Sequence, residues 1–184
     1  MQKYTAEQVV IRRVEPSDAA QMQRVTNGRG AYSGTLQLPY ASERIWQDRL
    51  AAHDANAQKT AQLLVAEVEG RVVGHAGLHL EGNLRRRHAA HFGIWVDDEF
   101  AGRGIGSLLT QAVLDLADNW LNVLRIELTV FVDNHAAQKM YIKHGFVQEG
   151  VLRAYAMRDG QLMDVWTMAR LHPRQALLPN TVML

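Results

Sequence analysis

The most constraining feature of this chain is a glycine-rich segment, AGRGIG at residues 101–106. It lies between an apolar run at 91–96 and a long amphipathic stretch at 107–120. This pattern predicts a strand that leads through a tight turn into a helix. Such a turn presents backbone N–H groups at the positive end of the helix dipole, which favours an anion. The hexamer alone is equally compatible with a turn that needs glycine only for its shape, so its role depends on the rest of the chain.

Length and composition indicate a single globular domain. The 184 residues suffice for one well-buried core, and we expect the domain at residues 1–172 and a tail without hydrophobic pattern at 173–184. The net charge of +1 gives no bulk attraction to nucleic acid. Because the chain contains no cysteine, disulfides, thiolate metal sites and a cysteine acyl-enzyme are excluded.

The sequence also lacks membrane signals. No apolar run approaches the roughly 18 residues that a membrane-spanning helix needs. The first residues do not form the apolar core of a signal peptide. We therefore expect a cytoplasmic protein with no membrane partner.

Hydrophobic periodicity and turn residues predict the helices and strands. Ser17 and Ser42 are expected to cap the first two helices, and Glu69-Gly70 and Asp159-Gly160 to form hairpin turns. Residues 27–40 are expected to form a loop and residues 54–60 a polar connection. The predicted strands lie at 9–11, 62–68, 71–80, 88–96, 126–130, 146–157 and 162–169, and the predicted helices at about 17–25, 42–53, 104–120 and 134–144.

The predicted order is β-α-α-β-β-β-α-β-α-β-β, which gives one α/β domain with helices flanking a mixed sheet. A dinucleotide-binding Rossmann domain would place its glycine fingerprint after the first strand, with an acidic residue about 20 positions later. Here the glycines follow the fourth strand, so the Rossmann alternative is rejected.

A second group of residues lies downstream of the glycine turn. VFVDN at 130–134 is followed by Ala137, Tyr141 and the pair Gly145-Phe146. Together with AGRGIG, these residues resemble the Gcn5-related N-acetyltransferase (GNAT) family, which uses acetyl-coenzyme A (acetyl-CoA). The order of elements matches that family as well, and the resemblance runs from the first predicted strand to about residue 171. It implies a GNAT fold, an acyl-transfer reaction and acetyl-CoA as cosubstrate, without a metal.

The resemblance also assigns the residues that bind the cofactor. The family's pyrophosphate loop, Gln/Arg-x-x-Gly-x-Gly/Ala, corresponds here to Ala101, Gly102, Arg103, Gly104, Ile105 and Gly106, with Ser107 directly after it. Both glycine positions match, whereas Ala101 replaces the usual Gln or Arg. Because backbone amides supply most of the binding, we expect the loop to tolerate this change, with the charge of Arg103 beside the phosphates. The pantetheine arm is expected along Ile94, Trp95 and Val96, where the resemblance implies that this strand separates from the next.

Three positions from the end of the VFVDN motif onward share one helical face: Asn134, Ala137 or Gln138, and Tyr141. The resemblance implies that Tyr141 is the general acid that protonates the departing thiolate. A thiol has a pKa of about 8.5 and tyrosine of about 10, so this transfer is mildly uphill and requires good alignment. Asn134 is expected to cap its helix and face the cofactor arm. The alternatives are a core aromatic for Tyr141 and a plain N-cap for Asn134.

A general base is expected at His91, at the start of the fourth strand, where relatives often place Glu or Asp. His75, His88 and Glu127 are alternative bases, and His91 is equally compatible with a strand-end position that has no catalytic part. The spacing of the histidines at 75, 79, 88 and 91 fits no standard zinc pattern, so no metal is expected.

Finer segments resemble one branch of the family, the bacterial amino-acid N-acetyltransferases. They lie at residues 32–39, 46–50, 118–121, 125–134 and 155–160. The branch acetylates the α-amino group of free amino acids, which implies an acceptor pocket that includes Tyr32 and Gln37. The arginines at 85–87 would suit a substrate carboxylate or a cofactor phosphate, although a solvated turn is favoured.

Other functions stay open on this evidence. They are acetylation of a polyamine, an antibiotic or a protein N-terminus, a non-catalytic acyl-CoA sensor, and an interaction domain with the same fold. A polyamine site should be acidic, and the one dense acidic run, at 97–99, lies beside the glycine turn. Direct transfer to a small amine, with an amino acid as the preferred acceptor, is therefore the main hypothesis. The resemblance also implies a homodimer as one possible assembly.

Overall fold

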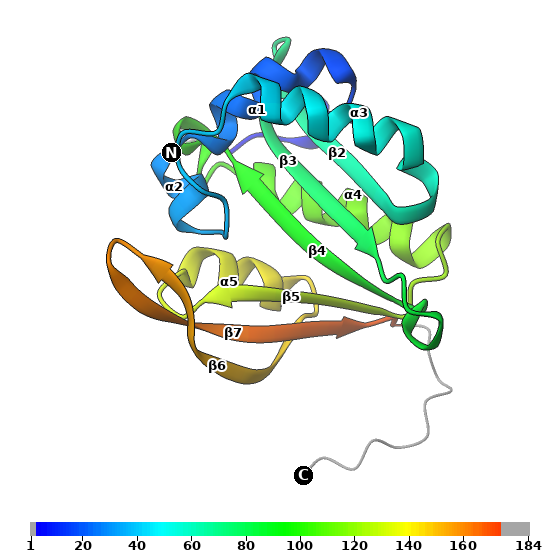
Figure 1. The fold of residues 1–184 in the computed structure, drawn as a ribbon. Helices are drawn as coiled ribbons and strands as arrows, with labels where there is room; N and C mark the ends of the chain where they lie inside the picture. Colours follow the sequence, from blue (N-terminus) through cyan, green and yellow to red (C-terminus); the bar gives the residue numbers. More distant parts are fainter. Residues whose placement is uncertain (1–2, 174–184) are drawn as a thin grey trace.

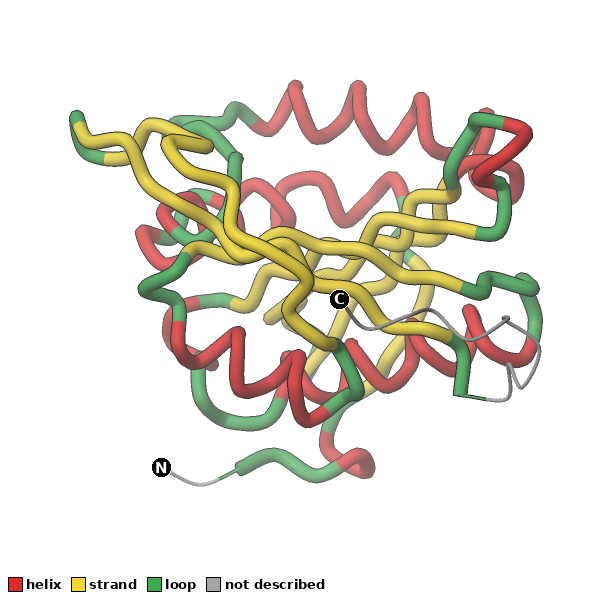
Figure 2. Tube along the Cα trace, turned by 90° about the horizontal axis from the view of Figure 1, so that it is seen from below, coloured by secondary structure: helices red, strands yellow, loops and turns green. Residues whose placement is uncertain are grey.

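The chain forms a seven-stranded sheet with helices on both faces, as Figure 1 and Figure 2 show. The computed structural model describes residues 3–173, and at 54–59 their backbone only. The strands are β1 Val10–Arg13, β2 Ala61–Val68, β3 Arg71–Leu80, β4 Ala89–Val96, β5 Arg125–Phe131, β6 Val147–Arg158 and β7 Gln161–Leu171. The helices are α1 Ala19–Thr26, α2 Arg29–Ser33, α3 Glu43–Thr60, α4 Ile105–Asn119 and α5 His135–Lys143.

The predicted α/β order is confirmed, with two differences in the helices before β2. The segment 27–40, expected to be a loop, contains the short helix α2. The segment 54–60, expected to be a polar connection, continues α3 up to β2. The sequence at 51–57 is rich in alanine, which has the highest helix propensity, and this favours helix where hydrophobic periodicity is weak.

The cap predicted at Ser17 is wrong, whereas the cap predicted at Ser42 is confirmed by a bond from Ile45 N to its Oγ of 3.4 Å. The buried carboxylate of Asp18 organises the first turn instead: it accepts from the backbone N–H of Glu15 at 2.8 Å and pairs with Arg12. A carboxylate that gains a charged partner as well as an amide outcompetes a neighbouring hydroxyl for this role.

The sheet has the order β1-β2-β3-β4-β5-β7-β6, and β4–β5 is its parallel pair. That pairing covers three residue pairs, Ala89 with Arg125, Ala90 with Ile126 and His91 with Glu127. Beyond them β4 and β5 diverge, as Figure 1 shows. The separation implied by the resemblance is therefore present, and it leaves the β5-facing backbone of residues 92–96 outside the sheet ladder.

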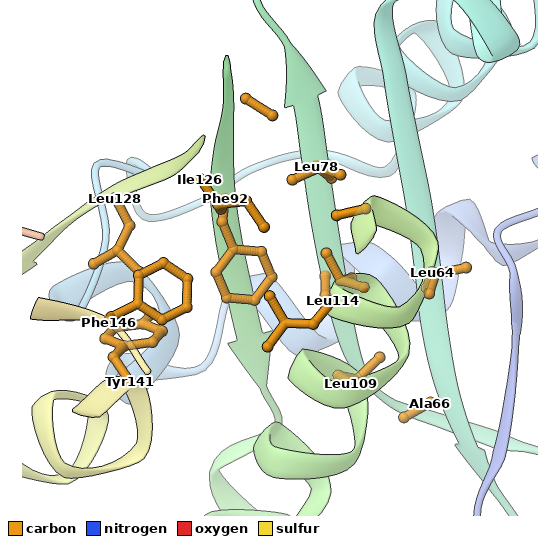
Figure 3. Packing of buried hydrophobic residues seen from close by; sticks show 14 of the residues in the cluster. Leu64, Ala66, Leu78, Phe92, Leu109, Leu114, Ile126, Leu128, Tyr141 and Phe146 are labelled. Carbon is orange, nitrogen blue, oxygen red and sulfur yellow. The ribbon is translucent and has the colours of Figure 1, made fainter. Parts of the chain in front are cut away.

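Two hydrophobic clusters cover the two faces of the sheet. The larger joins α4 and α5 to the sheet and includes Phe92, Leu109, Ile126, Tyr141 and Phe146 (Figure 3). The smaller joins α1 and α3 to β2 and β3, with Trp95 of β4 packed against it. Side chains of β4 thus alternate between the two faces of the sheet.

The described part of the chain contains no helix that is both long and apolar enough to cross a membrane. The predicted tail from Pro173 onward lies, apart from Pro173 itself, outside the described residues.

Candidate functional site

The glycine turn has the backbone geometry that an anion site needs. Gly102 and Gly104 have φ values of +72° and +95°, a region that residues with a β-carbon rarely adopt. Gly104 is the N-cap of α4, so the turn ends where the first N–H groups of that helix lack intrahelical acceptors. These N–H groups and the helix dipole favour a phosphate at this position.

A cavity of about 710 Å³ extends from this turn between α2, β4 and α5. Of the residues assigned from the sequence, ten line it: Ile94, Trp95, Val96, Ala101, Gly102, Gly104, Gly106, Ser107, Asn134 and Tyr141. The diverging edge of β4 thus meets the glycine turn and α5 in one space. The residues fit an extended molecule that carries phosphate at one end and pairs with a strand edge along its length.

Arg103 and Ile105 are placed differently from the rest of the loop. The guanidinium of Arg103 lies over the ring of Phe100, 5.6 Å from its centroid, and lines a small separate hollow with Lys3, Tyr4 and Gln8. Ile105 is fully buried in the core. The backbone of Arg103 remains in the turn, and that of Ile105 begins α4. Three lysines that the sequence did not point to, Lys3, Lys139 and Lys143, lie on the cavity wall.

Tyr141 lies on α5 at the junction of the cavity and the core. Its ring packs edge-on against Phe92, with 6.1 Å between centroids, and lies 5.7 Å from Phe146 (Figure 3). Burial raises the pKa of its phenol well above the usual value. The phenol is therefore neutral at physiological pH and able to donate a hydrogen bond into the cavity.

Asn134 caps α5, because its Oδ1 accepts from the N–H of Ala137 at 3.2 Å. It lines the cavity as well, so the two predicted positions of this residue are compatible. Of the two candidates one turn later, Ala137 lines the cavity, while Gln138 is buried and donates to the carbonyls of Phe131 and Val132.

His91 lies outside the residues that line the cavity. It is exposed at the start of β4, and its Nε2 is 3.6 Å from Glu81 and 3.9 Å from Glu127. Arg86 pairs with the same two carboxylates. For Glu127, burial acts to raise the pKa, but the pairs with Arg125 and Arg86 outweigh it and the pKa is lowered. Glu127 is thereby a weaker base than an unpaired carboxylate. His88, another alternative base, is exposed directly before β4.

The remaining alternative base, His75, is 3% exposed, and neither ring nitrogen has a hydrogen-bond partner among the described residues. Burial first, and then the neighbouring His79 and His53, lower its pKa to about 3, below the usual 6.5. The unfolded chain therefore binds a proton here between pH 6.5 and 3 that the folded chain does not. The stability that neutral His75 contributes is therefore complete above pH 6.5 and is lost as the pH falls from 6.5 to about 3.

A His75→Phe variant removes this titration and keeps a ring in the same space. We expect its free energy of unfolding to fall less than that of the wild type below pH 6.5, by up to about 1.4 kcal/mol per pH unit. Urea denaturation of both proteins at pH 7, 6 and 5 measures the difference. Parallel declines would mean that His75 is already charged in the folded state.

The predicted acceptor residues Tyr32 and Gln37 are near the cavity in sequence but do not line it. Instead, Gly30, Ala31, Gly34 and Thr35, which come from the same segment, form the wall. The Oε1 of Gln37 accepts from Arg49 of α3 at 3.0 Å. The segment that the sequence pointed to therefore borders the cavity. Which of its residues line the cavity depends on the helix α2, which the sequence did not predict.

The β6–β7 hairpin holds this wall in place. Arg158 donates to the carbonyl of Ser33 at 3.2 Å and pairs with Asp133, while Arg29 of α2 pairs with Asp159 at 3.1 Å. Asp98 accepts from the N–H of Gly30 at 3.1 Å from the side of the glycine turn. α2 is thus tied to the β6–β7 hairpin and to the segment that leads into the glycine turn.

A phosphate-binding turn, a free strand edge and a neutral phenol that share one cavity are what an enzyme needs to take an acyl group from coenzyme A. Comparison with known proteins agrees, because residues 31–146 match the acetyltransferase (GNAT) family. The chain belongs to this family and is an acetyl-CoA-dependent N-acetyltransferase.

Individual relatives cover almost all of the chain. L-amino acid N-acetyltransferase AaaT of Escherichia coli (strain K12) is 42% identical over 163 residues, which are 89% of this chain and 98% of the relative. Spermidine N(1)-acetyltransferase of Vibrio cholerae is 30% identical over 165 residues, which are 88% and 91%. The structure of spermidine N-acetyltransferase from Vibrio cholerae with CoA and spermine gives a TM-score of 0.77 at 27% identity, covering 90% of this chain and 96% of that one.

Proposed function

We propose that this protein transfers the acetyl group of acetyl-CoA to the α-amino group of a free L-amino acid. The observation that carries the proposal is the relative named as an L-amino acid N-acetyltransferase, whose 42% identity extends over nearly all of both chains. The charges around the cavity support an anionic ligand, because Lys3, Lys139 and Lys143 line it together with one carboxylate of the described residues, Asp98.

The donor would be held by groups that the cavity already presents. The N–H groups of the first turn of α4, with Ser107 and Lys143 nearby, suit the phosphates. The unpaired edge of β4 at residues 94–96 suits the amide groups of the pantetheine arm. In this proposal the cations of α5 take the part that the sequence assigned to Arg103.

The reaction that this arrangement supports is a direct transfer. The amine nitrogen forms a bond to the acetyl carbon, the bond from that carbon to sulfur breaks, and the amine gives up a proton. Tyr141 supplies a proton to the leaving sulfur, and the proton that the amine gives up returns to the phenolate through the base and water. Burial raises the pKa of the phenol, so this transfer is more uphill than from a free tyrosine and depends on alignment. An α-amino group has a pKa of about 8, so a weak base is sufficient near neutral pH.

His91 is proposed as that base, acting directly or through water, with Glu81 and Glu127 beside it. A His91→Ala variant should lower kcat/KM by about 100-fold and alter its pH dependence, because the proposed base is removed. Initial rates between pH 5 and 9 measure this. An unaltered profile would transfer the role of base to water or to another residue.

The second candidate acceptor is a polyamine, since a relative named as a spermidine acetyltransferase is 30% identical over most of this chain. A panel of L-amino acids, polyamines, aminoglycosides and short peptides, with release of CoA thiol as the readout, separates the candidates. The proposal expects turnover with amino acids. Turnover confined to another class would replace it, and binding of acetyl-CoA without any turnover would favour a sensor.

Assembly and location belong to the same proposal. Apolar side chains exposed on the edge strand β6, among them Val147 and Met157, each 66% exposed, support a homodimer. Light scattering of the purified protein gives its mass in solution. We also propose a cytoplasmic location, which fractionation of expressing cells tests.

A further inference from the structure

Trp95 has two separate surfaces in this fold. Its backbone belongs to the free edge of β4, but its side chain lies on the opposite sheet face from Ile94 and Val96, beside the layer of α1 and α3. Trp95 is among the residues that line the cavity, and its indole donates to Thr35, another lining residue. The side chain is therefore available to a molecule that approaches from the α1–α3 side.

One face of the indole is covered by a neighbouring ring. Trp95 and His75 are register partners on β4 and β3, and their rings stack with 4.9 Å between centroids and 25° between planes. Trp46 of α3 contacts His75 edge-on, with 6.1 Å between ring centroids. The buried imidazole of His75 makes no hydrogen bond among the described residues, so it acts here as a flat ring that supports Trp95.

The edge of the indole is fixed as well. Its Nε1 donates to the Oγ1 of Thr35 at 3.2 Å, and that hydroxyl donates to the carbonyl of Ala31 at 2.9 Å. Thr35 and Ala31 both belong to the cavity wall at residues 30–35. The ring also extends back over Gly93, where a β-carbon would lie 3.7 Å from its Cη2. The stacking on His75, the hydrogen bond to Thr35 and the space above Gly93 together fix the plane of the indole.

The second face of the indole points toward the gap between β4 and β5. β3 and β5 lie on opposite sides of β4, and His75 of β3 occupies the face on its own side. The other face is consequently directed to the side where β4 and β5 have separated, next to the edge on which the acetyl donor would lie. An acceptor that enters this gap meets a flat, rigid aromatic surface.

We propose that the indole of Trp95 is the specificity-determining wall of the acceptor site, against which the apolar side chain of the acceptor packs, and that His75 and Thr35 are the positioning residues that hold it. This inference rests on the proposed function and names the part of the acceptor that the site reads. A cationic side chain would also suit an indole face. However, the one carboxylate of the described residues that lines the cavity, Asp98, is engaged by Gly30, and the other charges there are lysines.

The test compares kcat/KM for alanine, methionine and phenylalanine as acceptors in wild type and Trp95→Ala. Loss of the wall should lower the values for methionine and phenylalanine by about 10-fold and change that for alanine by less than about threefold, the scale expected when one apolar contact is removed. The KM for acetyl-CoA should stay within about twofold, because the backbone edge is retained. Trp120→Ala is the matched control, since Trp120 is 76% exposed at the end of α4.

A uniform fall for all three acceptors, or a raised KM for acetyl-CoA with unchanged discrimination, would overturn the inference. A larger fall in kcat/KM for lysine or spermidine than for methionine in Trp95→Ala would overturn its apolar part. Trp95→Phe covers the case in which Trp95→Ala does not fold, and it should keep part of the discrimination. If the wild type acetylates amines but no amino acid, the proposed function fails, and an alkylamine series of increasing length then tests Trp95 by the same ratio.

The positioning residues need a readout that loss of stability alone would not move. Thr35→Val should reduce the methionine-to-alanine ratio of kcat/KM without changing the KM for acetyl-CoA. His75→Ala should reduce the same ratio, whereas His75→Phe, which keeps a ring against the indole, should restore it. Lower thermal stability with the wild-type ratio in both Thr35→Val and His75→Ala would contradict the positioning role.

Discussion

A Gly104→Val variant should bind acetyl-CoA at least about 100-fold more weakly than the wild type, an increase of about 2.7 kcal/mol in the free energy of binding. Gly104 has φ of +95° at the N-cap of α4, a conformation that β-branched residues strongly disfavour. The added side chain also occupies the position from which the phosphates approach the N–H groups. Isothermal titration calorimetry with acetyl-CoA measures the change.

Gly70→Val is the matched control for this variant. Gly70 has φ of +76° in the turn between β2 and β3, where a β-carbon would meet no described atom within 4 Å. The control therefore carries a similar backbone strain away from the cavity and should bind acetyl-CoA like the wild type. Equal affinities for both variants would show that the glycine turn does not bind the donor.

A Tyr141→Phe variant should lower kcat by about 100-fold, the lower end of what loss of a general acid costs. The packing against Phe92 and Phe146 is retained because only the hydroxyl is removed, so stability and acetyl-CoA affinity should change little. Steady-state rates together with calorimetry separate the two effects.

The variant at Tyr141 needs a control for the loss of a hydroxyl group. Tyr40→Phe, which removes a hydroxyl from a side chain that is 94% exposed, should leave kcat unchanged. A Tyr141→Phe variant with normal kcat and weakened cofactor binding would instead make Tyr141 a residue that shapes the cavity.

The sequence predicts the fold well because local signals and fold agree along most of the chain. Both hairpin turns, at 69–70 and 159–160, are where glycine and acidic residues place them. The helix after the glycine turn and the cap at Asn134 follow from residue type and spacing. Segments without a strong period, at 27–40 and 54–60, are where the prediction differs from the structure.

The sequence predicts a site residue only where the position of its backbone, rather than the direction of its side chain, brings it to the cavity. Gly102, Gly104, Asn134 and Tyr141 lie in motifs, and all four line the cavity, while their roles stay predictions. The direction of Arg103 is not encoded in its motif, because its ring contact with Phe100 depends on a separate element, η4 at Asp98–Phe100. The cavity wall at residues 30–35 likewise depends on bonds to residues far away in the sequence, Asp98, Arg158 and Asp159.

The most direct test of the central claim is to identify the product by mass spectrometry after incubation with acetyl-CoA and single L-amino acids, alongside the amount of CoA thiol released. We expect an N-acetylated amino acid in an amount equal to the thiol, with both absent when the α-amino group is blocked. Thiol release without an N-acetylated amino acid, or the same rate with the blocked acceptor, would contradict it.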